Sequence, residues 1–107
     1  RSSAASVVYK RQLKGLSAEK ALKRGAVLAV SEGKYQIVDA ASATPALKVA
    51  NAVLAEDVVV GTGDVVATVY ISGIFNAEEM SVGAESDSVQ AHEEELRAVG
   101  IYLTHLQ

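Results

Sequence analysis

The sequence contains no cysteine, no tryptophan and a single proline, and its aromatic residues are four tyrosines and one phenylalanine in 107 residues. Without cysteine the chain has no disulfide, no thiolate zinc site and no cysteine nucleophile. No run approaches the ~20 apolar residues that a membrane-spanning helix needs, and no signal-peptide pattern is visible. The chain begins at Arg1 and not at Met, so we expect residues upstream of it.

Small apolar residues are abundant instead. Alanine and valine make up about a third of the chain, well above ordinary usage. Valine favours strands because its branched Cβ suits a pleated surface. The length fits one domain, but small side chains each bury little area. We therefore expect a partner or a homo-oligomer to complete the core.

Charge is distributed unevenly. Residues 1–34 hold eight Lys and Arg against two acids, a net of +6, whereas residues 35–107 hold two against eleven, a net of −9. A basic arm on an acidic body can dock on an acidic protein surface, bind nucleic acid, or remain a solvated tail. Nucleic acid is disfavoured because the arm has one aromatic residue, Tyr9, and the acidic body repels phosphate.

The stretch 51–76 organises the chain. It predicts two apolar strands joined as a hairpin by the turn Gly61-Thr62-Gly63-Asp64, with a bend at Glu56-Asp57. Both faces of the second strand begin apolar, which indicates a central strand covered on both sides. The stretch carries no reactive group, which favours a protein that binds and holds.

The other elements follow from shorter signals. Residues 17–25 predict one or two helical turns, 26–30 and 35–38 a hairpin, 39–48 a loop, 88–99 a helix ended by Gly100, and 101–104 a closing strand. Asp87 or Ser88 can cap this helix, Val89, Leu96 and Val99 share one face, and Glu93 can pair with Arg97. The expected class is α+β, mostly β: a small compact β-rich domain (17–107) with one C-terminal helix and an extended N-terminal arm (1–16).

Catalytic and metal chemistry find no support in the residues. His92 has Glu95 as its only plausible second ligand and is expected on a solvated helix face; His105 is expected to be exposed. The pairs Glu56-Asp57 and Glu78-Glu79 point to alternate faces in a strand, so neither converges by itself. The Gly61-Thr62-Gly63 stretch lacks the remaining residues of a phosphate-binding loop. We expect no catalytic site, no metal and no cofactor.

Five segments, taken in order, carry a resemblance that covers most of residues 22–103. They are LKRGAVL (22–28), GKY (33–35), AVLAEDV (52–58), ATVYISGIFN (67–76) and LRAVGIYL (96–103). Their succession resembles the bacteriophage lambda-like head decoration protein family.

The resemblance implies a mostly β fold that forms homotrimers and is not an enzyme. Such trimers add to the outer surface of the expanded capsid at three-fold and quasi-three-fold sites in the virion, after assembly in the host cytoplasm, and stabilise it against packaged DNA. The implied partner is the major capsid protein, without nucleic acid, membrane or small-molecule substrate. The arm adds a strand to it, a role that falls on Ser6, Val7, Val8, Tyr9, Lys10 and Arg11, with Lys14 also meeting acidic capsid surface.

Within the central stretch, we expect neighbour contacts at Glu56, Asp57, Ser72, Gly73, Phe75 and Asn76. The alternative is a small β-barrel that binds a ligand or carrier group, which needs a concave pocket with convergent polar groups. A hydrolase using Glu56-Asp57 or His105 is a weaker alternative.

Overall fold

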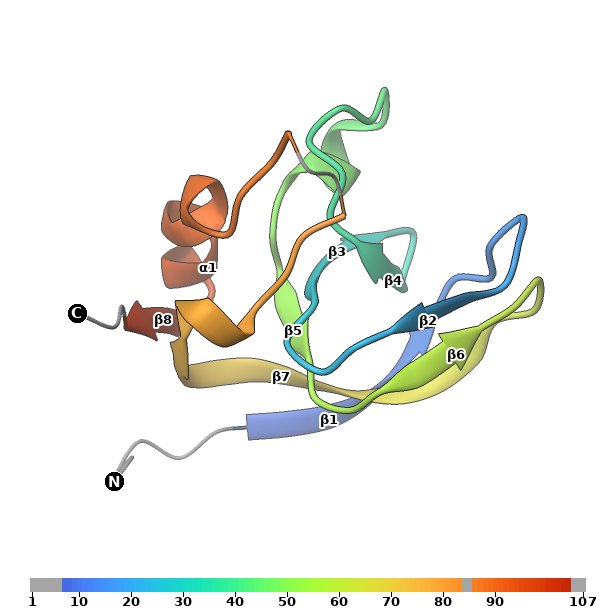
Figure 1. The fold of residues 1–107 in the computed structure, drawn as a ribbon, viewed down its shortest axis with the longest axis horizontal. Helices are drawn as coiled ribbons and strands as arrows, with labels where there is room; N and C mark the ends of the chain where they lie inside the picture. Colours follow the sequence, from blue (N-terminus) through green and yellow to red (C-terminus); the bar gives the residue numbers. More distant parts are fainter. Residues whose placement is uncertain (1–6, 84–85, 105–107) are drawn as a thin grey trace.

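A computed structural model describes residues 7–83 and 86–104 of the chain. The expected class is confirmed: the structure is mostly strand, with one C-terminal α-helix (Figure 1). The strands are β1 (Val7–Leu13), β2 (Lys20–Leu22), β3 (Val27–Ser31), β4 (Lys34–Ile37), β5 (Ala52–Leu54), β6 (Val58–Val60), β7 (Val65–Asn76) and β8 (Ile101–Thr104). The helices are α1 (Glu93–Ala98) and three 3₁₀ turns, η1 (Pro45–Lys48), η2 (Ala77–Glu79) and η3 (Gln90–His92).

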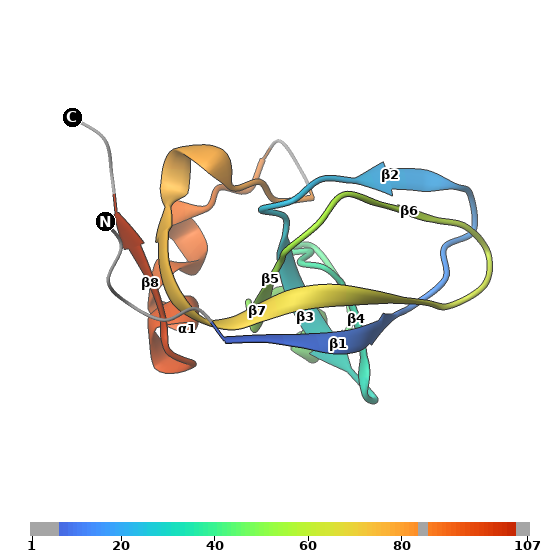
Figure 2. The same ribbon diagram turned by 90° about the horizontal axis from the view of Figure 1, so that it is seen from below.

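Five strands close on themselves. Their order is β1-β4-β3-β5-β7, and β1 also pairs with β7. β8 extends the sheet in parallel along the last residues of β7, and β2 pairs with β6 in a separate two-stranded sheet. Figures 1 and 2 place α1 and β8 at one end of the long axis and the β2–β6 pair toward the other.

Side chains alternate between two apolar clusters on opposite sides of the sheet. Leu28, Ala52 and Leu54 belong to an inner cluster with Leu13 and Val69. The residues between them belong to an outer cluster, which Leu96 of α1 and Ile101 of β8 complete; it consists of Val27, Ala29, Val38, Ala50, Val53, Leu96 and Ile101. The strands buried on both faces are therefore β3 and β5, as the pleat of a covered central strand requires.

β7 corrects the expectation for the central stretch. It is not a hairpin partner of β6, because β6 pairs with β2 while β7 pairs with β1, β5 and β8. Only one face of β7 is fully covered in its first half: Ala67 and Val69 are buried, whereas Val66 on the other face is 63% exposed. The expected bend at Glu56-Asp57 is confirmed, since β5 ends at Leu54 and β6 starts at Val58 with a different partner strand.

Residues 17–25 were expected to be helical, and this is wrong. Lys20–Leu22 form β2, with Ala21 opposite Val59 of β6. A helix of two turns is marginal without packing, so a valine-rich strand 38 residues downstream (Ala21 to Val59) decides the conformation. The expected hairpin of β3 and β4 is confirmed, with Val30 opposite Tyr35.

The expected C-terminal helix is present but divided. The Ser88 hydroxyl accepts a hydrogen bond from the Ala91 N–H (3.2 Å), so Ser88 caps η3, and α1 follows from Glu93 to Ala98. Arg97 pairs with Glu93 at 3.4 Å as expected. Of the three residues assigned to one face, Val89 and Leu96 are buried and Val99 is 38% exposed. The closing strand is β8, as expected.

Candidate functional site

β1 presents an open strand edge. One edge of β1 pairs with β7 from Val7 to Leu13, while the other meets β4 only at Leu13 opposite Tyr35, where the Lys14 N–H donates to the Tyr35 carbonyl (2.9 Å). Backbone groups alternate between the two edges of a strand, so those of Lys10 point the same way as those of Lys14, away from β7. Thr68, opposite Lys10, uses its own N–H and C=O toward Glu56 and Ala55. No described strand pairs with this outer edge before Leu13.

The side chains of β1 change character along the strand. Leu13 is buried in the inner cluster and anchors the C-terminal end. Val7 is 37% exposed, and Val8 and Tyr9 are each 48% exposed. The Arg11 guanidinium lies 4.7 Å from the centre of the Tyr9 ring, and its Nη1 donates to the Lys10 carbonyl (3.0 Å). The N-terminal end of β1 therefore combines exposed apolar side chains with positive charge; Ser6 lies outside the described residues.

The structure places Glu56 and Asp57 in intramolecular roles. The Glu56 carboxylate accepts the Thr68 N–H (2.7 Å), and that of Asp57 accepts the Arg24 N–H (2.8 Å). Both thus satisfy backbone donors on separate segments around the bend between β5 and β6.

Residues at the end of β7 are also held within the chain. The Gly73 N–H donates to the Gly100 carbonyl (3.1 Å), and the Asn76 side chain accepts the Glu78 N–H (2.9 Å). The Phe75 ring lies 4.7 Å from that of Tyr70, tilted by 50°. Ser72 lies opposite Val7 of β1, so this part of β7 adjoins the exposed end of β1.

A pocket of about 150 Å³ lies beside the end of β7. Phe75 and Asn76 line it together with Arg24, whose backbone N–H is bound by Asp57. The Arg24 guanidinium also donates to the Tyr70 hydroxyl (3.2 Å). Side chains of the inner cluster, by contrast, are buried: Leu13, Leu28 and Val60 are at most 1% exposed. The pocket that Leu13 and Val60 line measures only about 80 Å³, well below the roughly 300–1,000 Å³ of ligand sites, which disfavours the alternative function, a ligand-binding barrel.

Comparison with known proteins decides the family. The family model described as bacteriophage lambda head decoration protein D matches residues 2–101. The chain belongs to this family. No curated protein matches it. The family consists of structural proteins of the phage capsid, so the chain has a capsid decoration role and is located on the phage head.

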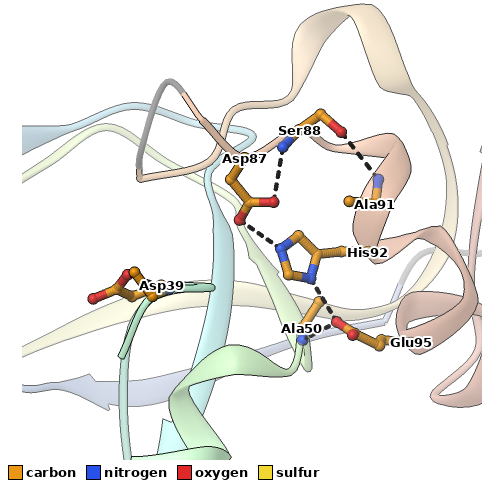
Figure 3. A network of polar contacts seen from close by, with 8 residues as sticks. Asp39, Ala50, Asp87, Ser88, Ala91, His92 and Glu95 are labelled. Carbon is orange, nitrogen blue, oxygen red and sulfur yellow. Dashed lines mark hydrogen bonds and ion pairs between the residues drawn. The ribbon is translucent and has the colours of Figure 1, made fainter. Parts of the chain in front are cut away.

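His92 of this decoration protein corrects the expectation of a solvated residue (Figure 3). It is 3% exposed. Its Nε2 lies 2.6 Å from an Asp87 carboxylate oxygen, and its Nδ1 lies 2.6 Å from a Glu95 oxygen. Burial lowers the pKa of His92, but the hydrogen bonds to Asp87 and Glu95 and their negative charges outweigh it and raise the pKa above the ordinary 6.5. His105 lies outside the described residues.

Neither a metal site nor a membrane span is found in the described part of the decoration protein. No group of three or more His, Cys, Asp or Glu residues there is placed to hold a metal ion. Likewise, none of its helices within 7–83 and 86–104 has the length and apolar character to cross a membrane.

Asp64 links segments at one end of the sheet through its side chain, a role that the sequence did not reveal. Its carboxylate pairs with the Lys34 ammonium at 2.6 Å and accepts the Gly15 N–H at 2.7 Å. The Lys34 hydrogen bond, followed by that of Gly15, holds the pKa of Asp64 below its ordinary 3.8. The contact joins the chain after β1 to β4 and to the start of β7 in the decoration protein. Asp64 stood out only as a turn residue, because its partners are distant in sequence.

Proposed function

We propose that the protein binds as a homotrimer to the outside of the expanded capsid, at three-fold and quasi-three-fold sites. There it stabilises the shell against the pressure of packaged DNA. The major capsid protein is the partner, and contact runs through Ser6, Val7, Val8, Tyr9, Lys10 and Arg11, supported by Lys14. The observation that carries this proposal is the open outer edge of β1 beside exposed apolar and basic side chains.

An extended capsid segment completes that edge as an added strand. Outward backbone groups of β1 pair with the segment, which is the usual source of affinity in strand addition. Val7, Val8 and Tyr9 lose exposed apolar area in the contact. Lys10 and Arg11 provide charge complementary to an acidic capsid surface and accelerate encounter.

Trimer formation converts weak individual contacts into firm attachment. Three copies present three β1 edges around one axis, so the second and third contacts form at high effective concentration. Attachment to several capsid subunits at once then opposes their separation. This arrangement needs no chemistry from the protein, which agrees with the structural character of the family.

A pair of substitutions at Lys10 tests strand addition. Lys10→Pro removes one outward N–H, whereas Lys10→Gln removes the charge and keeps the N–H. Loss of one inter-chain hydrogen bond costs about 1 kcal/mol per contact. Over three contacts this predicts about 100-fold weaker attachment for the proline variant than for the glutamine variant. Co-sedimentation with expanded capsids measures the binding, and light scattering measures the oligomeric state.

The controls separate binding from folding. Because Lys10 lies opposite Thr68, whose backbone groups point toward β5, Lys10→Pro should leave the pairing of β1 with β7 intact. Urea unfolding of both variants checks this. Equal capsid binding by the two folded variants would contradict strand addition at β1. Deletion of residues 1–11 would be a poorer test, because it also removes the β1 residues that pair with β7.

A further inference from the structure

The one buried ionisable cluster among the described residues lies at the C-terminal unit, which comprises η3, α1 and β8. Asp87 precedes η3, His92 ends it, and Glu95 lies in α1. The side chains of His92 and Asp87 are 4% and 5% exposed, and that of Glu95 is 32% exposed. Nothing in capsid attachment through β1 uses these groups.

With Asp87 and Glu95 ionised, the geometry requires a doubly protonated ring. A neutral imidazole has one N–H donor and one acceptor nitrogen. In this protein both ring nitrogens lie 2.6 Å from carboxylate oxygens, which accept and cannot donate when ionised. His92 is therefore an imidazolium held by two charge-assisted hydrogen bonds.

The same carboxylates fasten the cluster to its surroundings. The Glu95 oxygen that binds His92 also accepts the N–H of Ala50 (2.8 Å), which lies two residues before β5. The second oxygen of Asp87 accepts the Ser88 N–H (2.8 Å) at the start of η3. The cluster thus joins the segment before η3, the helix α1 and the entrance to β5 (Figure 3).

The other charged groups near His92 have partners of their own and do not bond to its ring. Glu93 and Glu94 pair with Arg97 on the outer face of α1. Asp39, after β4, directs its carboxylate to the Ala41 N–H (3.0 Å), and Figure 3 shows it pointing away from His92. The charge of His92 is therefore balanced by Asp87 and Glu95.

We propose that His92, clamped between Asp87 and Glu95, is a proton-dependent latch that holds the C-terminal unit on the sheet. Loss of the proton removes the donor from one nitrogen and leaves the buried Asp87 and the partly exposed Glu95 without a cation between them. The unit then opens at α1 while the inner cluster, which contains none of these residues, stays folded. Leu96 supplies the apolar contact that recloses it.

The direction of the pH dependence follows from the raised pKa. The contribution of the latch is fully present below the unfolded value of about 6.5. It is lost as the pH rises through the higher pKa of the folded state. Alkaline conditions therefore open the latch.

Amide hydrogen exchange measured by NMR on the full chain tests the proposal. We compare α1 amides with those of Ala67 and Val69 in the same sample, because the intrinsic effect of pH then cancels. From about pH 6.5 to about pH 9, relative protection of α1 should fall at least about 10-fold, with a midpoint at the His92 ring titration. In Glu95→Gln the midpoint should move to lower pH, since one carboxylate is lost while an acceptor for Ala50 remains.

His105→Gln is the matched control, because the chain has only two histidines. This variant should retain the full pH dependence of relative α1 protection. A folded His92→Gln variant should lack that dependence and show low α1 protection at every pH. Ring titration of His92 at or below 6.5, or relative protection that ignores pH in the unmodified chain, would overturn the latch. So would transfer of the pH dependence to His105.

Discussion

Gly25 combines a left-handed backbone conformation with very little room for a side chain. Its φ is +95°, and an added Cβ would lie 2.3 Å from the Glu79 carbonyl oxygen. That oxygen belongs to backbone that cannot easily retreat, since Ser81 two residues on donates to the Gly25 carbonyl (3.1 Å). Gly25 itself donates to the Leu54 carbonyl (2.8 Å), so its own backbone is also fixed. Gly25→Ala should therefore be costly.

The expected magnitude has two parts. The left-handed conformation costs an alanine about 1–2 kcal/mol. Displacing the Glu79 backbone adds an overpacking cost of about 1–3 kcal/mol, so Gly25→Ala should lose about 2–5 kcal/mol in total. Domains of this size are typically stable by about 5–15 kcal/mol, and the variant should still fold. Urea unfolding followed by circular dichroism, at one protein concentration, measures the loss.

Gly33 provides the matched control. It lies in the β3–β4 turn with φ of +81°, and an added Cβ would meet nothing within 4 Å. Gly33→Ala should cost only the conformational part, about 1–2 kcal/mol. A Gly25→Ala variant no less stable than Gly33→Ala would refute the reasoning, because the two differ in steric contact and share the backbone conformation.

Two further predictions concern the outer cluster and the closure of the sheet. Leu96→Ala should lower the free energy of unfolding by about 2–5 kcal/mol, whereas Val99→Ala, nearby but partly exposed, should cost less than about 1 kcal/mol; thermal unfolding distinguishes them. Asp64→Asn should make the free energy of unfolding depend less on pH under acidic conditions. The depressed pKa of Asp64 gives a contribution that is present above 3.8 and is lost as the pH falls through the lower folded value. A plot of unfolding free energy against pH should be flatter at acid pH in this variant, and an unchanged slope would contradict a role for the Lys34 pair.

Local features of the fold could be predicted because a few adjacent residues encode them. The β3–β4 hairpin followed from Glu32-Gly33, where both residues have positive φ in the structure. The cap at Ser88, the Glu93–Arg97 pair and the break at Glu56-Asp57 are likewise local. The family resemblance also rested on sequence alone, and the match over residues 2–101 confirms it.

The candidate site was only partly predictable. The apolar and basic residues of β1 were recognised from composition, and the structure places Val7–Leu13 beside β7 of the same chain with one edge open. Whether residues 7–13 stay unpaired or join the sheet depends on an available edge of β7, about 60 residues away in sequence. Contacts of these residues with a capsid stay a prediction.

The sequence by itself determined the family, the β-rich class and the turns, since period, capping and turn chemistry act over a few residues. Only the tertiary structure decided that residues 20–22 form a strand, that β6 and β7 pair with different strands, and that His92 is buried. Each of these depends on a partner distant in the chain: Val59 for Ala21, Tyr70 for Val8, Ala50 for Glu95. The physical reason is that strand pairing and burial are properties of residues brought together by folding, which no local window contains.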